Sequence, residues 1–151
     1  MENYVRSVRV SSTARDQLIR LKRFTGVQHW NVLCRWAFCR SLAEPHAPSP
    51  SPLGEMSNVE MTWQVFAGPL SEAFLMGLRQ RIAEDGLPED EETFQTQFKL
   101  HLHRGIAYLA GENVRRIDSL AERAVMALLP QVGIPFVAHE SVADEPDASD
   151  T

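Results

Sequence analysis

The segment from Val5 to Leu42 reads VRSVRVSSTARDQLIRLKRFTGVQHWNVLCRWAFCRSL, and its periodicities decide the fold. Alternation of β-branched and polar residues over residues 5–10 predicts a short strand. Ser11, Ser12 or Thr13 can cap the helix that follows, because their side-chain oxygens accept hydrogen bonds from free backbone N–H groups. Apolar residues then recur every three or four positions, and a glycine such as Gly26 commonly ends a helix in the left-handed conformation. The pattern predicts a strand and a helix that ends at Gly26.

A second helix is predicted from residue 29 or 30 to residue 42. Its apolar residues cover most of its circumference: Trp30, Val32, Leu33, Trp36, Ala37, Phe38 and Leu42. A helix that is apolar on most sides is buried on most sides. Because a chain of 151 residues offers few elements to surround it, we expect a partner subunit to cover part of this helix.

A short basic strand followed by two helices is the order found in ribbon–helix–helix DNA-binding proteins. In these proteins two chains pair their strands, and the ribbon enters the major groove. By this analogy Ser7 and Arg9 point outward to the bases, and Val8 and Val10 share the opposite face of the strand. The start of the second helix, around Gln28–Asn31, would offer N–H groups to a phosphate.

The rest of the chain predicts further helices after a linker. The Pro- and Ser-rich linker spans residues 45–57. MTWQVF at residues 61–66 predicts a second short strand, and apolar periodicity predicts helices over residues 70–84, 91–109 and 113–129. We therefore predict a mainly α fold with one domain over residues 1–130, in which residues 5–43 form a ribbon–helix–helix-like unit and residues 61–129 form the second strand and helices.

Residues 131–151 are expected to form a flexible, disordered acidic tail, because they offer little to bury. The acids of this tail are Glu140, Asp144, Glu145, Asp147 and Asp150. We hypothesise that the tail competes with DNA for basic side chains elsewhere in the chain. Truncation at Phe136 tests this, since an unchanged DNA affinity at low salt would contradict it.

Positive charge is concentrated in the first 43 residues. They hold eight Lys/Arg and two acids, a net charge of +6, whereas the other 108 residues hold seven basic and eighteen acidic side chains, a net of −11, and the sum is −5. Counterion release on binding DNA depends on the local basic patch. The DNA-binding candidates are therefore the basic residues of this segment: Arg6, Arg9, Arg15, Arg20, Lys22, Arg23, Arg35 and Arg40.

Signals for an enzyme are weak. The sequence contains no phosphate-binding glycine loop, no nucleophile elbow and no recognisable metal-ligand spacing, so neither a cofactor nor a metal ion is expected. His101 and Arg104 are the catalytic candidates, because cleavage of a phosphodiester needs a base and either a metal ion or an arginine. Both are expected on a polar stripe of the predicted helix, opposite the core. His103 lies on a different face, so the two histidines cannot hold one metal ion.

The sequence favours a cytoplasmic protein that does not span a membrane. No apolar run approaches the length of a membrane span, and the N-terminus has no apolar signal region. Cys34 and Cys39 are five residues apart, which places them on different faces of a helix and argues against a mutual disulfide. Free, buried thiols fit a reducing compartment.

Three blocks of sequence resemble the DndE family: LIRLKRFTGVQHWNVLCRWAFCRSLAEP at residues 18–45, MTWQVFAG at residues 61–68 and LHLHRGIAYLAG at residues 100–111. This family is the small subunit of the bacterial machinery that replaces a non-bridging phosphate oxygen of DNA with sulfur. The resemblance implies a mainly helical protein that self-associates as a tetramer and binds DNA, favouring nicked duplex. It also implies partners: a cysteine desulfurase, an iron–sulfur protein and an ATPase-like protein.

Surface lysines contact DNA in the family that the chain resembles, and this chain has only Lys22 and Lys99. Lys22 lies in the matching LKR motif, and arginines stand at the other basic positions, where their planar fork binds phosphate. We therefore expect a DNA-binding subunit that holds the DNA backbone. The alternatives are a DNA-nicking endonuclease that acts through His101 and Arg104, and a scaffold that binds the other modification subunits and not DNA.

Overall fold

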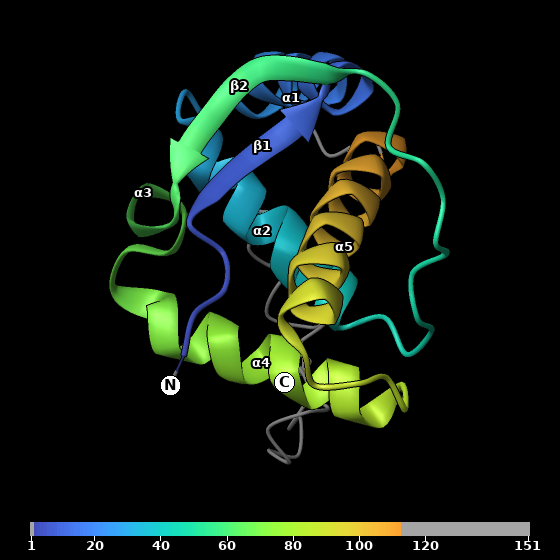
Figure 1. The fold of residues 1–151 in the computed structure, drawn as a ribbon. Coiled ribbons are helices and arrows are strands. Elements are labelled where there is room, and N and C mark those ends of the chain that lie inside the picture. The colour runs from blue at the N-terminus through green and yellow to red at the C-terminus, as the bar shows by residue number, and fades with distance from the viewer. Residues whose placement is uncertain (1, 113–151) are drawn as a thin grey trace, which may run out of the picture.

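The computed structural model describes residues 2–112, which form two strands and five α-helices (Figure 1). In chain order they are β1 (Ser7–Ser11), α1 (Ser12–Thr25), α2 (Trp30–Leu42), β2 (Met56–Thr62), α3 (Trp63–Ala67), a 3-10 turn (Gly68–Leu70), α4 (Ser71–Glu84) and α5 (Glu91–Gly111). The mainly α fold class is confirmed. The predicted helix over residues 113–129 and the acidic tail lie outside the described residues.

The predicted strand–helix–helix order at the N-terminus is confirmed. The Ser11 hydroxyl accepts a hydrogen bond from the N–H of Ala14 (3.1 Å) and caps α1. At the other end Gly26 has a φ of 75°, and its N–H donates to the carbonyl of Lys22 (3.0 Å). Only glycine adopts this left-handed conformation without a steric penalty, so α1 ends where the sequence predicted.

The two strands form an antiparallel ribbon within one chain, in which Arg9 lies opposite Glu60. The prediction of a second short strand is confirmed, but the predicted bounds of 61–66 are wrong, because the strand covers Met56–Thr62 and the next residues form α3. The Thr62 hydroxyl accepts from the N–H of Val65 (3.2 Å) and starts that helix. Its aromatic residues, Trp63 and Phe66, are three apart and both buried, a spacing that places them on one face of a helix but on opposite faces of a strand.

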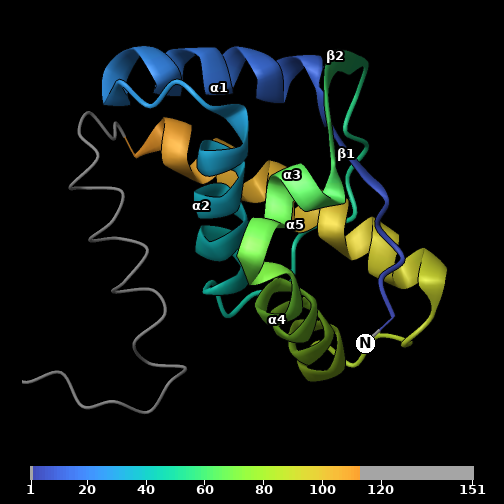
Figure 2. The same cartoon turned by 90° about the vertical axis from the view of Figure 1, so that its left-hand side faces the viewer.

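The helices pack around α2, which lies between α1 at one end of the molecule and α4 at the other (Figure 2). Phe38 of α2 is fully buried, with ring centroids 5.8, 5.7 and 5.2 Å from those of Phe66, Phe74 and Phe98. These rings come from α3, α4 and α5 of the same chain. The chain itself therefore buries this side of α2, whereas Trp30, Val32 and Trp36 are only partly buried, and the partner subunit stays a prediction.

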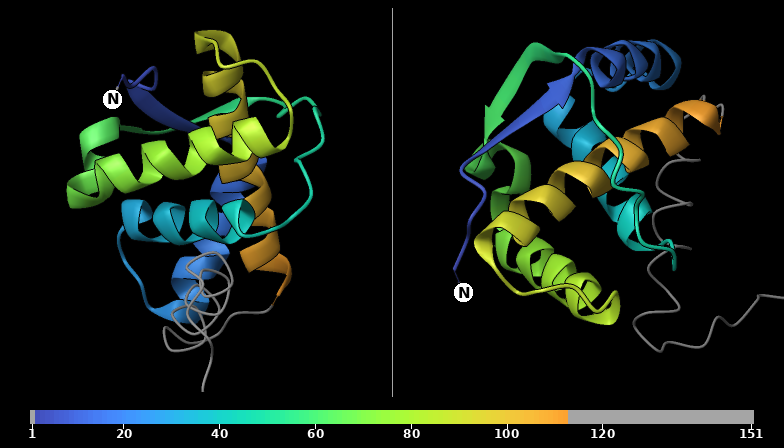
Figure 3. Two further views of the ribbon diagram at one scale, coloured as in Figure 1. Left: turned by 90° about the horizontal axis from the view of Figure 1, so that it is seen from below. Right: turned by 45° about the vertical axis from the view of Figure 1, so that its right-hand side comes forward.

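Helices α2 and α5 cross with their backbones in direct contact (Figure 3). A Cβ atom on Gly105 would lie 1.7 Å from the carbonyl oxygen of Ala37. No rotation of a side chain relieves a clash with backbone, so only glycine fits at this position of α5. The crossing fixes the direction of α5 relative to β1, and this direction shapes the groove described below.

Both cysteines are free thiols, as the sequence predicted. Burial raises the pKa of Cys34 to about 12 and that of Cys39 to about 11. Both thiols are therefore protonated at neutral pH, and neither is a reactive nucleophile.

Candidate nucleic-acid interface

The outer face of the ribbon carries exposed polar side chains from both strands. Ser7 and Arg9 are exposed while Val8 and Val10 are buried, so the two faces of β1 are as the sequence predicted. Asn58, Glu60 and Thr62 of β2 are also exposed. The Arg9 guanidinium lies along the ribbon, where its Nε donates to the carbonyl of Ser57 (2.7 Å). This face is polar and mixed in charge.

A cavity of about 600 Å³ lies beside the ribbon, at the start of α2; we call it the α2 hollow. Its basic side chains, Arg15 and Lys22, both come from one side of α1. The Lys22 Nζ lies 3.7 Å from the ring centroid of Trp30. The other lining residues are Gln28, His29, Asn31, Asn58, Val59, Glu60, Met61 and Val65. The hollow thus combines cations with an aromatic ring, a combination that proteins use to bind nucleic acids.

The first turn of α2 borders the same hollow. His29 is its N-cap residue and makes no side-chain capping bond. The Asn31 side chain donates to the carbonyl of Val65 (3.2 Å) and so links α2 to α3. Unsatisfied N–H groups at the start of a helix carry partial positive charge, which adds to the charges of Arg15 and Lys22. The structure therefore brings the predicted segment Gln28–Asn31 together with two of the predicted basic residues.

Arg20 and Arg23 project from other sides of α1 and are exposed. Neither side chain has a hydrogen-bonded acceptor or an ion-pair partner among residues 2–112. Arg15 approaches only Asp16, at 4.0 Å, and both side chains are largely solvent-exposed. An exposed pair at this distance contributes little, so the positive charge of α1 is not neutralised by the chain.

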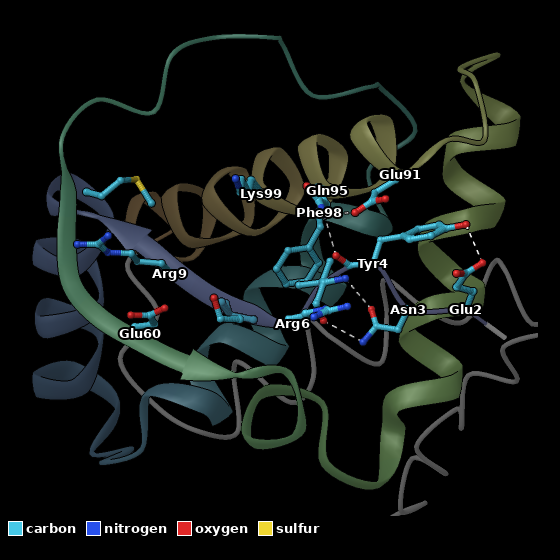
Figure 4. Close-up of a pocket in the computed structure, with 14 residues that line it drawn as sticks. Glu2, Asn3, Tyr4, Arg6, Arg9, Glu60, Glu91, Gln95, Phe98 and Lys99 are labelled. Atoms are coloured by element: carbon cyan, nitrogen blue, oxygen red, sulfur yellow. Dashed lines mark hydrogen bonds between the residues drawn. The ribbon is translucent and has the colours of Figure 1, made fainter.

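A second cavity, of about 670 Å³, lies on the other side of β1, between this strand and α5 (Figure 4); we call it the β1 groove. It is lined by Glu2, Asn3, Tyr4, Val5, Arg6, Ser7, Val8, Arg9, Met56, Glu60, Glu91, Gln95, Phe98 and Lys99. The side chains of Arg6 and Lys99 have no acceptor among the described residues. Lys99 was not among the predicted DNA-binding residues, because it lies some ninety residues from Arg9 in sequence and meets it only through the fold.

Arg35 and Arg40, the two predicted DNA contacts on α2, are bound by acceptors of the chain itself. Arg35 donates from Nε to the carbonyl of Phe66, and from Nη2 to that of Val65 (3.0 Å). Arg40 forms ion pairs with Glu44 (3.1 Å) and Glu112 (2.9 Å). These arginines connect α2 to its neighbours, so their charges are not open to a phosphate in the way those of α1 are.

His101 and Arg104 do meet, but inside the protein. His101 is 0% exposed, and its Nδ1 lies 2.9 Å from the Ser41 hydroxyl. Arg104 donates from Nε to the same hydroxyl (2.8 Å) and from Nη1 to the carbonyl of His46 (2.6 Å). The expected polar stripe opposite the core is therefore wrong at His101. Burial, and after it the positive charges of Arg104 and Arg81, lowers the pKa of His101 to about 3, so its imidazole is neutral and shielded from solvent.

His103, two residues further along α5, ties the ribbon to this helix. Its Nε2 accepts a hydrogen bond from the N–H of Ser11 (3.0 Å). The Nδ1 lies 2.7 Å from the carbonyl of Lys99, which requires the proton on Nδ1. Burial lowers the pKa of His103, in keeping with a neutral ring that accepts at Nε2. His103 therefore joins β1 to α5 just past Arg9 and Lys99, which line the β1 groove.

The described part of the chain shows neither a metal-binding cluster nor a membrane-spanning helix. Residues 2–112 contain no cluster of three or more His, Cys, Asp or Glu side chains that could hold a metal ion. Over the same residues, no helix combines the length and the apolar character needed to cross a membrane.

Two solved structures share this fold. A crystal structure of DndE from Escherichia coli B7A, involved in DNA phosphorothioation modification, matches with a TM-score of 0.58 and 22% identity, over 72% of this chain and 99% of that one. A mutant of DndE, also described as involved in DNA phosphorothioation, matches with a TM-score of 0.53 and 23% identity, over 70% of this chain and 97% of that one. No curated protein sequence matches the chain.

The family model described as DNA sulphur modification protein DndE matches residues 7–116. This range contains the ribbon and helices α1 to α5. It is well over half of the 151 residues. The chain therefore belongs to the DndE family.

Proposed function

We propose that this DndE-family chain is the DNA-binding subunit of a phosphorothioation machinery and holds the DNA backbone against the face formed by the ribbon and α1. The proposal rests on the observation that the cationic side chains fall into two groups, those that the chain's own oxygens bind and those that they do not. Five have no hydrogen-bonded acceptor and no ion-pair partner within residues 2–112; we call them the open cations, Arg6, Arg20, Lys22, Arg23 and Lys99. All five lie on or beside β1, on α1, or on the half of α5 that lines the β1 groove.

The remaining cations of α2, α4 and α5 are bound by the chain's own oxygens; we call them the engaged cations, Arg35, Arg40, Arg79, Arg81 and Arg104. Phosphate contacts release counterions only where a protein charge is available to replace them. The open cations are available and the engaged ones are not. This division supports a DNA surface on the ribbon–α1 face.

The chemistry of the machinery fits a subunit that holds phosphate. Replacing a phosphate oxygen with sulfur requires the backbone to be fixed and oriented, and phosphate contacts do this without reading the base sequence. The α2 hollow and the β1 groove flank the ribbon, and each contains one of the two lysines, Lys22 and Lys99. A backbone that reaches both must curve around the ribbon, and a nick lowers the cost of bending. We therefore propose a preference for nicked duplex.

Self-association would join several ribbon–α1 faces into one basic surface. We propose a tetramer that acts in the cytoplasm beside the other phosphorothioation subunits. Light scattering of the full-length protein, alone and with DNA, measures this assembly directly.

The decisive experiment measures binding of the full-length protein to intact, nicked and single-stranded forms of one duplex at two salt concentrations. The gel is also read for cut product. We expect salt-sensitive binding that favours the nicked duplex, with no new nicks. An absence of binding at low salt would support the scaffold alternative, in which the basic face meets an acidic partner protein.

New nicks in intact duplex would instead support the endonuclease alternative. The arrangement around His101 does not favour it, because a general base must reach the proton that it removes and this ring is buried against Ser41. A His101→Gln variant separates the two readings, since loss of nicking with unchanged folding would assign the cleavage to this residue.

A further inference from the structure

One edge of β1 has no hydrogen-bonding partner within residues 2–112. The N–H of Trp63 donates to the carbonyl of Arg6 (3.0 Å), which fixes the hydrogen-bonded positions of the antiparallel register. Because main-chain groups alternate between the two edges of a strand, those of Ser7 and Arg9 point away from β2. No hydrogen bond to another described residue satisfies them. An unpaired strand edge is a template for a further strand.

This edge faces the β1 groove. Just past Arg9 and Lys99, which line the groove, the N–H of Ser11 donates to His103 of α5 (3.0 Å) and joins the strand to the helix. Near the other end of the groove the Gln95 side chain of α5 donates to the carbonyl of Tyr4 (3.0 Å). Between these two bridges a strand edge and a helix flank an open cavity of about 670 Å³ (Figure 4). Domains that bind peptides by strand addition use this arrangement of edge and groove.

The groove is polarised along its length. Arg9 and Lys99 lie toward one end, and Glu2 and Glu91 lie toward the other (Figure 4). Glu60 also lines the groove, from β2 opposite Arg9. Val5, Val8 and Phe98 of the apolar lining belong to the core, and the partly buried Tyr4 and Met56 complete it. Opposite charges at the two ends would fix the direction of a bound segment.

We propose that the β1 groove binds an extended peptide segment of a partner protein, which adds to the free edge of β1 as a third strand. The segment carries an acidic residue near Arg9 and Lys99 and a basic residue near Glu2 and Glu91. A second copy of β1 fits this site poorly, because α5 lies beside the same edge in each copy and would have to enter the groove together with the strand. This inference does not depend on DNA binding.

The test uses random heptapeptides displayed on phage and selected on the full-length protein. Selected peptides, once synthesised, should slow hydrogen exchange of the Ser7 and Arg9 amides at least about tenfold, because strand addition protects both N–H groups. Two methylated versions of each peptide are compared, one with methyl groups on the odd-numbered backbone nitrogens and one on the even-numbered. Only one of these two sets of N–H groups can point toward β1, so one version should lose binding and the other should keep it, although both keep every side chain. Lys99→Glu should weaken binding at least about tenfold. The matched control is Arg20→Glu, which lines neither cavity and should leave binding unchanged.

Several outcomes would overturn the proposal. One is a selection that yields no binding peptide, and another is a set of peptides whose binding survives methylation in both registers. Ser7 and Arg9 amides that are already protected in the free protein would also overturn it. If the free protein is a monomer, protected amides would mean that another segment of this chain pairs with the edge of β1. If it is an oligomer and the protection is lost on dilution, they would mean that a second copy of the chain pairs with this edge.

Discussion

The ribbon together with α1, and the group of helices α2, α4 and α5, use arginine side chains in opposite ways. On the first, Arg20 and Arg23 extend into solvent without an acceptor among the described residues. At the second, Arg104 donates three hydrogen bonds to the chain itself, and Arg40 pairs with two carboxylates. The difference shows that the net charge of a segment does not locate a binding surface. What matters is which cations the fold leaves unpaired.

Two of the engaged cations, Arg81 and Arg104, also hold the start of the linker that leads to β2. Arg81 donates to the carbonyl of Pro45 (3.2 Å) and Arg104 to that of His46 (2.6 Å). Arg81 in turn pairs with Glu84 and Asp85 (both 3.1 Å). Fixing the linker fixes the path by which the chain returns to form the ribbon. Arg81 and Arg104 thus help to position the ribbon beside which the open cations lie.

The largest expected effect comes from removing the support of that surface. Gly105→Ala places a Cβ atom 1.7 Å from the carbonyl oxygen of Ala37, so α2 and α5 must separate. We expect a loss of more than about 4 kcal/mol of unfolding free energy, measured by urea denaturation. The control is Gly111→Ala on the same helix, where a Cβ atom meets nothing within 4 Å. That change should be neutral, or stabilise by up to about 1 kcal/mol, and equal losses in the two variants would refute the backbone contact.

An engaged cation should matter for stability and not for DNA. Arg104→Ala leaves the Ser41 carbonyl and the His46 carbonyl without this donor, and we expect a loss of about 3 kcal/mol. The salt dependence of DNA binding should be unchanged under conditions where the variant is folded. Arg20→Ala on α1 is the converse variant and should change stability by less than about 0.5 kcal/mol. If Arg104→Ala kept its stability but bound DNA with a weaker salt dependence, the division into open and engaged cations would be contradicted.

The neutral His101 predicts a loss of stability in mild acid. Its pKa is lowered to about 3 in the folded protein and is about 6.5 in an unfolded chain. The unfolded state therefore binds the proton first, and stability falls as the pH drops below about 6.5. From pH 7 to pH 5 the expected loss is about 2 kcal/mol. His103, whose pKa is also lowered, adds in the same direction.

Urea denaturation at several pH values measures this loss. His101→Gln should remove most of the slope between pH 7 and pH 5. If the dependence of stability on pH is unchanged in the variant, groups other than His101 are responsible for it.

Lys99 tests where the DNA-binding surface ends, because it lies on α5 but lines the β1 groove. If the open cations define the DNA surface, Lys99→Ala should flatten the plot of log binding constant against log salt by about one. An unchanged slope would confine the DNA surface to β1 and α1. The fold of the variant is checked by circular dichroism.

Sequence reasoning succeeded where local signals decide the structure. The Ser11 cap, Gly26 and the apolar stripe of α1 lie within one segment, and together they predicted its boundaries. The bounds of the second strand were predicted wrongly, because a distant segment and not a local signal decides them. Met56–Thr62 has little strand propensity of its own and is extended because it pairs with β1, some fifty residues away. Trp63 and Phe66 have strand propensity, but Thr62 caps a helix there and both rings are buried on one side of it.

The candidate site shows the same limit. Ser7 and Arg9 were predicted outward from alternation alone. That Arg35 and Arg40 are engaged could not be predicted, because their acceptors include Phe66 and Glu112, which are distant in sequence. His101 was misplaced because a histidine one turn from an arginine is usual on a helix surface, whereas here the ring is buried and the hydroxyl of Ser41, sixty residues earlier, contacts both side chains.

The central claim is that DNA contacts the open cations and not the engaged ones, and one salt series tests it. The binding constant for nicked duplex is measured against salt for the wild type, for Lys22→Ala with Arg23→Ala, and for Arg79→Ala, whose guanidinium donates to the carbonyl of Glu2. The claim predicts that the slope flattens by about two in the double variant and is unchanged in Arg79→Ala. An unchanged slope in the double variant, or an equal loss per charge in Arg79→Ala, would contradict it.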